Sequence, residues 1–130
     1  MRAIIIDPSR RSVIEADIDG SARSVADIIG CDRLSMVYEF ETGDSLYVDE
    51  DGGLRAQEAI ARGDDVERAA AFDVGAQRTF LGKGVVLGPE DGLGGNLDAV
   101  MSPARLSSIV FVEAPAAASD AHWAKPTRKD

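Results

Sequence analysis

The chain has 130 residues, 45% of them hydrophobic, and a formal net charge of −9 from 23 acidic and 14 basic side chains. This length suits one cooperative domain and is too short for two ordinary ones. Because direct binding to nucleic acid depends on clustered Lys and Arg, the acidic balance argues against DNA or RNA as a direct ligand. The apolar runs are far below the roughly 20 residues that cross a bilayer, and the start of the chain has too short an apolar region for a secretory signal. We therefore expect a cytoplasmic protein without membrane contact.

The first elements expected in chain order are a β-hairpin and a short amphipathic helix. Apolar residues predict strands over 3–6 and 12–18, joined by a tight turn. Ser21 is a typical N-cap, apolar residues follow it at helical spacing, and Gly30 occupies the position where helices end in a left-handed residue. We expect this helix to pack on the sheet.

A second hairpin should follow, with strands over 34–41 and 45–48 and a turn at 42–44. The first of these strands alternates in polarity, so one face should be buried and the other largely solvated. The residues expected on its buried face are Leu34, Met36, Tyr38 and Phe40.

The second half of the chain is less regular. We expect a helix or loose helical excursion over 54–71, strands over 72–74, 79–87 and 109–113, a mobile loop over 88–95, and a short helix that begins at Ser102. The fold class predicted is α+β: a small mixed or mainly antiparallel sheet with two or three short helices packed on it. One domain would cover residues 1–113, and Ala, Pro and charge in 114–130 predict a flexible tail.

Residues for catalysis are scarce. The single cysteine, Cys31, excludes an internal disulfide and fits a reducing compartment, and its place after Gly30 favours a buried or half-buried thiol over a nucleophile. The single histidine, His122, lies in the tail, and no G-x-S-x-G motif is present. We predict no catalytic residues and no enzymatic activity.

An acidic tract covers the second hairpin without an intervening Lys or Arg. Its carboxylates are Glu39, Glu41, Asp44, Asp49, Glu50 and Asp51. They could form a surface that engages a basic partner or imitates a nucleic-acid backbone, or simply a solvated hairpin face. A calcium loop begun at Asp49 would need a closing glutamate at position 60, which is Ile60, so we predict no metal site.

The segment FLGKGVVLGPEDG, residues 80–92, looks like a phosphate-binding loop and fails the tests for one. A P-loop needs Ser or Thr after its Gly-Lys pair, but Gly84 follows Lys83. A dinucleotide loop needs G-x-G-x-x-G before a helix, whereas Gly82, Gly84 and Gly88 have the wrong last spacing and a strand continues between them. The segment therefore predicts a strand relieved by glycines.

Lys83 is the residue of chemical interest in this strand. In a regular strand it would share a face with Leu81 and Val85, where an ammonium must snorkel, pair with a carboxylate or meet an anionic ligand. The opposite face, with Gly82 and Gly84, is open enough for another backbone or a flat ligand. The alternative is a glycine bulge that turns Lys83 outward to guard a sheet edge.

The order of segments resembles an uncharacterised family, a domain of unknown function found in small proteins of bacteriophages, mobile plasmids and their bacterial hosts. The motifs that carry the resemblance are I-I-I-D-P, I-I-G, L-Y-V-D-E-D-G-G-L and F-L-G-K-G-V-V-L-G, within residues 2–112. Family members often have V-x-N-E-E-G-K-L at Val48–Leu54 and G-x-x-V-V-x-G at Gly82–Gly88, and this chain departs in its longer middle segment, 55–77, and in its tail. The resemblance implies a genomic setting and no catalytic residue.

These observations favour a non-enzymatic accessory protein of a mobile genetic element or its bacterial host. It would bind a protein partner through the acidic hairpin face or an exposed sheet edge, and a defence-countering inhibitor is one version. The alternative is a module for an anionic, nucleotide-like small molecule, bound by the strand Gly82–Gly88 with Lys83 and Arg78. We expect no cofactor, and a monomer or small homo-oligomer.

Overall fold

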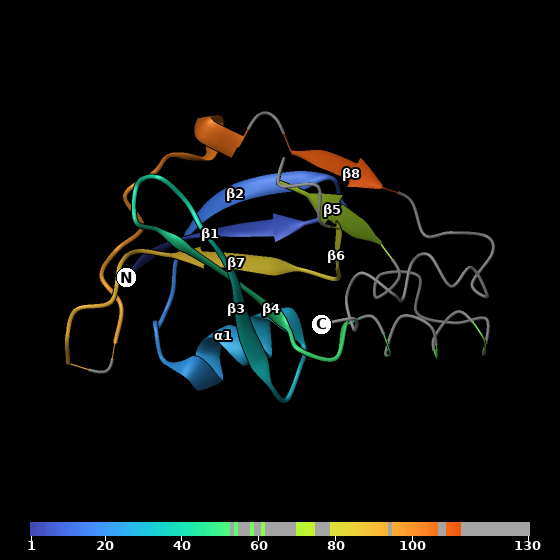
Figure 1. The fold of residues 1–130 in the computed structure, drawn as a ribbon, viewed down its shortest axis with the longest axis horizontal. Helices are drawn as coiled ribbons and strands as arrows, with labels where there is room; N and C mark the ends of the chain where they lie inside the picture. The colour runs from blue at the N-terminus through green and yellow to red at the C-terminus, as the bar shows by residue number, and fades with distance from the viewer. Residues whose placement is uncertain are drawn as a thin grey trace.

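A computed structural model gives the fold and describes residues 1–52, 54, 58, 61, 70–74, 79–93, 95–106 and 109–112. Within this part of the chain the elements are β1 (Arg2–Asp7), β2 (Ser12–Asp17), α1 (Ala22–Ile29), β3 (Leu34–Glu39), β4 (Ser45–Asp49), β5 (Ala71–Asp73), β6 (Thr79–Leu81), β7 (Gly84–Leu87), the 3-10 helix η1 (Pro103–Leu106) and β8 (Val110–Val112). The strands form a five-stranded sheet, in the order β2-β1-β7-β4-β3, and a three-stranded sheet, in the order β6-β5-β8 (Figure 1). All described strand pairs are antiparallel, so the expected α+β class with antiparallel pairing is confirmed. The strands form two sheets, however, where the sequence predicted a single small one.

Both faces of the five-stranded sheet are covered, and Figure 1 shows α1 on one side and β5, β8 and η1 on the other. Because side chains alternate along a strand, Ile4 and Ile6 of β1 point to one face and Ala3 to the other. The core on the side of the small sheet consists of Ile4, Ile6, Leu46, Val48, Phe72, Phe80, Val86, Ala99, Met101 and Leu106. The core beneath α1 consists of Ala3, Val25, Val85 and Leu87, with partly buried neighbours such as Leu34 and Tyr47.

The first hairpin and the helix have the predicted form. In this hairpin Arg2 pairs with Asp17 at the open end, and Asp7 pairs with Ser12 next to the turn. The Ser21 hydroxyl accepts from the Ser24 N–H (3.2 Å), and Gly30 ends α1 at φ 85°. A left-handed residue at this place favours glycine, since other side chains are strained there.

The number of helices is smaller than expected. α1 is the only α-helix whose bounds are described, although the described residues Gly52, Leu54, Glu58 and Ala61 also have helical backbone. The helix expected after Ser102 is the single 3-10 turn η1. The prediction of two or three helices on the sheet therefore exceeds the number of described helices. The segment after Ser102 contains few apolar residues, and it forms only a short 3-10 turn. Most of the expected middle helix, 54–71, and the expected tail, 114–130, lie outside the described residues.

The strand predicted over 79–87 is two strands in different sheets. Gly82 has φ +86°, a value that interrupts a strand, and its N–H donates to the Ala70 carbonyl (2.8 Å). Before this corner β6 pairs with β5, and after it β7 lies between β1 and β4 in the large sheet. The chain therefore passes from one sheet to the other at Gly82 and Lys83.

The predicted alternation of β3 is also broken. Its register with β4 shifts between Met36 and Tyr38, which marks a β-bulge. Leu34 consequently packs on the core beneath α1, whereas Tyr38 and Phe40 pack on the core beneath the small sheet. A bulge inserts one extra residue and so reverses the faces that follow it, which the period-two pattern could not register.

Candidate functional site

The six carboxylates of the acidic tract are not one surface. Asp44 and Asp49 are buried, with 0% and 8% of their surface exposed. The remaining four are the exposed Glu39, Glu41 and Glu50 and the half-buried Asp51. Because β3 and β4 form a hairpin, two of these lie near its turn and two at its open end. At the open end Arg33 pairs with Glu50 (2.8 Å) and contacts Asp51 (3.7 Å).

Asp44 is a structural residue of this hairpin. Its carboxylate accepts hydrogen bonds from the N–H groups of Val100 (2.9 Å) and Met101 (2.8 Å) and from the Thr42 hydroxyl (2.9 Å). A buried carboxylate is tolerated when such donors replace water. Asp44 thus joins the β3–β4 turn to the segment 98–101. Because its side chain is buried, it is not part of a surface that a partner protein could contact.

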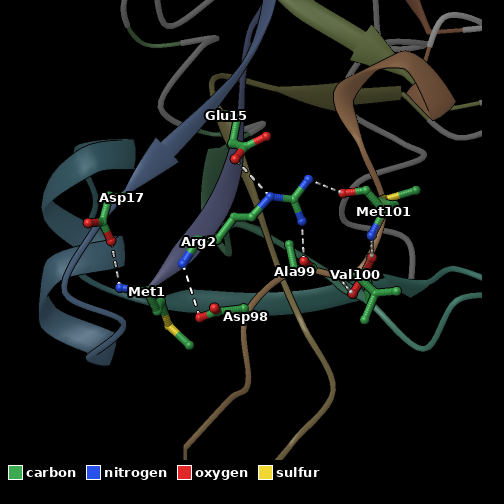
Figure 2. Close-up of polar contacts among 9 residues, drawn as sticks. Met1, Arg2, Glu15, Asp17, Asp98, Ala99, Val100 and Met101 are labelled. Atoms are coloured by element: carbon green, nitrogen blue, oxygen red, sulfur yellow. Dashed lines mark hydrogen bonds and ion pairs between the residues drawn. The ribbon is translucent and has the colours of Figure 1, made fainter.

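Arg2 holds the same segment from the other side, as Figure 2 shows. Its guanidinium donates to the carbonyl oxygens of Ala99 and Met101, the latter at 2.8 Å, and pairs with Glu15 (2.8 Å). The hydrogen bond to Glu15 is the main cause that raises the pKa of Arg2 above its ordinary value. The backbone adds two contacts, from the Arg2 N–H to Asp98 Oδ1 (3.1 Å) and from the Ala99 N–H to the Arg2 carbonyl (2.9 Å).

The role of Arg2 and Asp44 was missed by the sequence patterns. Arg2 is 97 residues from Ala99, and Asp44 is 56 residues from Val100, so no local spacing connects them. The available signals were an arginine next to an apolar strand and an aspartate inside a tight turn, and both are common at surfaces.

The glycine strand offers little space to a ligand. A Cβ on Gly84 would lie 2.7 Å from Phe72 Cζ, and one on Gly88 would lie 2.0 Å from the Asp98 carbonyl oxygen. The room that these glycines leave is therefore filled by an aromatic ring and by backbone of the same chain. Gly82 has no atom within 4 Å of such a position.

Lys83 lies at the corner between the sheets and is half-buried. The expected strand face shared with Leu81 and Val85 does not exist, since these residues belong to different sheets. None of the ion pairs within the described residues includes Lys83. Arg78, the other expected anion ligand, lies outside the described residues.

A groove of about 440 Å³ lies between α1 and the start of β3. Its lining residues are Ala22, Arg23, Ala26, Asp27, Cys31, Asp32 and Leu34. Val25 turns into the core, whereas the residues of α1 that line the groove follow one another at i, i+3 and i+4 spacing along a neighbouring stripe. The small side chains of Ala22 and Ala26 leave the space open, and the half-buried Cys31 lies among the lining residues.

The groove borders a sheet edge, because no strand in the described residues pairs with the outer side of β3. The Glu50 N–H donates to the Arg33 carbonyl (2.9 Å), which makes Leu34 and Asp49 a non-hydrogen-bonded pair. It follows that Leu34 and Met36 direct their backbone N–H and C=O groups away from β4. Met36 is also 52% exposed.

No group of three or more metal-binding side chains occurs within the described part of the chain. Nor do these residues include a helix long and apolar enough to span a membrane.

Comparison with protein families matches residues 1–104 to a family described as a domain of unknown function, DUF3846. The chain belongs to this family. The match confirms the resemblance found in the sequence motifs, and it includes the middle segment in which this chain departs from them. No curated protein and no solved structure matches the chain.

Proposed function

We propose that this DUF3846 protein is a non-enzymatic binding protein that accepts an extended segment of a partner protein on the outer edge of β3. The observation that carries the proposal is the coincidence of a strand edge that pairs with no other described strand and a groove beside it. In strand addition the backbone supplies affinity and the neighbouring groove supplies selectivity for a side chain.

The geometry supports addition at the first half of β3. The N–H and C=O groups of Leu34 and Met36 can bond a strand from a partner, which would become the sixth strand of the sheet, while Leu34 lines the groove. The bulge after Met36 twists the strand and restricts regular pairing to Leu34–Met36. The bulge also protects the rest of the edge from uncontrolled pairing with other chains.

The sequence resemblance supplies the setting of the proposal: an accessory protein of a mobile genetic element or its bacterial host. An inhibitor that counters host defence is one form that such an accessory protein takes. Binding by strand addition suits this role, since it needs only a short extended segment on the target. The small-molecule alternative is not carried forward, because Phe72 and the Asp98 backbone fill the space over Gly84 and Gly88.

The test is affinity capture from the host with three forms of the protein. Met36→Pro removes an outward N–H without removing a bond to β4, whereas Met36→Thr keeps that N–H and serves as the matched control. We expect the wild type and Met36→Thr to recover the same stoichiometric partner and Met36→Pro to lose it. Recovery of that partner by a folded Met36→Pro would refute the proposal, as would the absence of any partner across salt concentrations.

If Met36→Pro does not fold, as judged by circular dichroism and thermal unfolding, Ala22→Phe replaces it. Ala22 is exposed at the start of α1, so a larger side chain there fills the groove and leaves the core intact. Loss of the partner supports the proposal, and unchanged recovery contradicts it.

A further inference from the structure

The surroundings of the β3 edge are strongly acidic on the face that α1 covers. Asp27 and Asp32 line the groove. Glu39 pairs with Ser45, and Ser45 pairs in turn with Leu87, which lies in the core beneath α1. Glu39 is therefore on the same face of the sheet as the groove, and it is exposed.

Within the part of the chain that the structure describes, two arginines lie near these carboxylates. Arg23 lines the groove, and Arg33 is already engaged with Glu50 and Asp51. Counted over the described residues around the edge, six carboxylates and two arginines give a formal excess of four negative charges. The carboxylates are Asp27, Asp32, Glu39, Glu41, Glu50 and Asp51. An occupant with positive side chains would gain from this field, and an acidic one would be repelled.

The size and lining of the groove also limit which side chain of the occupant can enter it. Ala22, Ala26 and Leu34 give it an apolar part, and about 440 Å³ is enough for one large aliphatic or aromatic side chain. In an added strand only every second side chain faces α1. The residue that enters the groove and those two positions before and after it therefore share one face, at about 7 Å intervals.

We infer that the occupant is a basic extended segment in which an apolar residue is flanked by Lys or Arg at the second position on each side, in the pattern basic-x-apolar-x-basic. The inference rests on the proposed function, and it names the partner chemistry of the same edge. The apolar side chain enters the groove beside Leu34, and the two basic side chains meet Asp27 or Asp32 at one end and Glu39 at the other.

The experiment uses three fluorescent nine-residue peptides of matched length. The first has the sequence Ser-Thr-Lys-Thr-Leu-Thr-Lys-Thr-Ser. The second moves both lysines next to the leucine and so onto the opposite face, and the third replaces both lysines with glutamate. Fluorescence polarisation gives the affinities, and protection of the single Cys31 from alkylation reports whether a peptide occupies the groove.

We expect the first peptide to bind at least tenfold more tightly than the other two and to protect Cys31. Raising the salt concentration should weaken it, because the contacts are exposed charge pairs. Asp27→Asn and Glu39→Gln should each weaken it about threefold, a typical effect for one exposed charge pair. Glu90→Gln removes the same charge from the 88–97 loop and should leave the affinity unchanged.

The outcomes separate the two proposals. If all three peptides bind equally and Met36→Pro abolishes binding, the basic pattern is wrong and strand addition stands. If no peptide binds but a host partner is recovered in a Met36-dependent way, the basic pattern is again wrong and the proposed function stands. If neither peptides nor a partner depend on the edge, both proposals fail.

Discussion

Two extended segments of this protein differ in how their backbone N–H and C=O groups are paired. The segment 98–101 lies outside the sheets, yet Asp44 accepts from its N–H groups and Arg2 donates to its carbonyl oxygens. The start of β3 lies in a sheet, yet its outer N–H and C=O groups point away from every described strand. Buried backbone must be paired within the protein, whereas an edge can be left to water or to a partner. The closed segment 98–101 therefore stabilises the fold, and the open edge of β3 is the part that we propose for binding.

The largest loss of stability should come from Asp44→Ala, which removes hydrogen bonds to the segment 98–101. The substitution leaves the buried N–H of Met101 and the part-buried N–H of Val100 without an acceptor, so we expect the free energy of unfolding to fall by about 2–3 kcal/mol. Chemical denaturation measures this loss. Glu41→Gln, an exposed change next to the same turn, is the control and should change stability by less than about 0.5 kcal/mol. Equal effects of the two would show that the closed segment contributes nothing.

A smaller loss is expected from Gly84→Ala, which disturbs the covered face of the sheet. The new Cβ would lie 2.7 Å from Phe72 Cζ and 3.0 Å from Leu46 Cδ1, so the ring must move, at a cost of about 1–3 kcal/mol. Adding Phe72→Leu should recover part of the loss, because it removes the atom that clashes. A Gly84→Ala protein as stable as the wild type would mean that the space above Gly84 is open. The glycine face would then again be a candidate ligand site.

One pH effect is expected in the 88–97 loop, which leads into the closed segment 98–101. Hydrogen bonds from the Leu93 N–H (2.7 Å) and Gly95 N–H (3.1 Å) lower the pKa of Asp91. The carboxylate form is thus favoured in the folded protein. Its contribution is present above the ordinary aspartate pKa and is lost as the pH falls through the lowered value. In a pH titration by NMR, the Leu93 and Gly95 amides should change below that ordinary value; a midpoint at the ordinary value would exclude these bonds.

The smallest effect should follow Lys83→Met at the corner between the sheets. Lys83 is half-buried and takes part in none of the ion pairs among the described residues, so the melting temperature should change by no more than a degree or two. Peptide binding at the β3 edge should also be unchanged. A loss of binding would contradict the assignment of the binding site to the β3 edge and would favour a site at this corner.

Local patterns predicted those features whose cause is local. The caps of α1 at Ser21 and Gly30 follow from a hydroxyl acceptor and a left-handed residue, and the first hairpin follows from two apolar strands around a tight turn. The split of the expected strand 79–87 was not predictable in this way. Gly82 could have continued a strand, and only the pairing of β6 with β5 and of β7 with β1 and β4 fixes the corner.

The candidate site shows the same division more sharply. The sequence indicated a sheet edge or an acidic face as the binding surface, and the structure buries Asp44 and Asp49 while leaving the edge of β3 without a strand partner among the described residues. The groove could not be predicted, because it depends on the distance between α1 and Leu34 in the folded chain. A bulge in β3, which depends on packing against β4, decides which of its side chains share that face.

The sequence alone determined the composition, the acidic balance, the helix caps, the turn glycines and the motifs that place the chain in its family, since each depends on residue type or short spacing. Only the tertiary structure decided which carboxylates are buried, which strand is left at an edge and what lies beside it. Burial and pairing depend on contacts between residues far apart in the chain, such as Arg2 with Ala99 and Asp44 with Val100, and no local pattern encodes them.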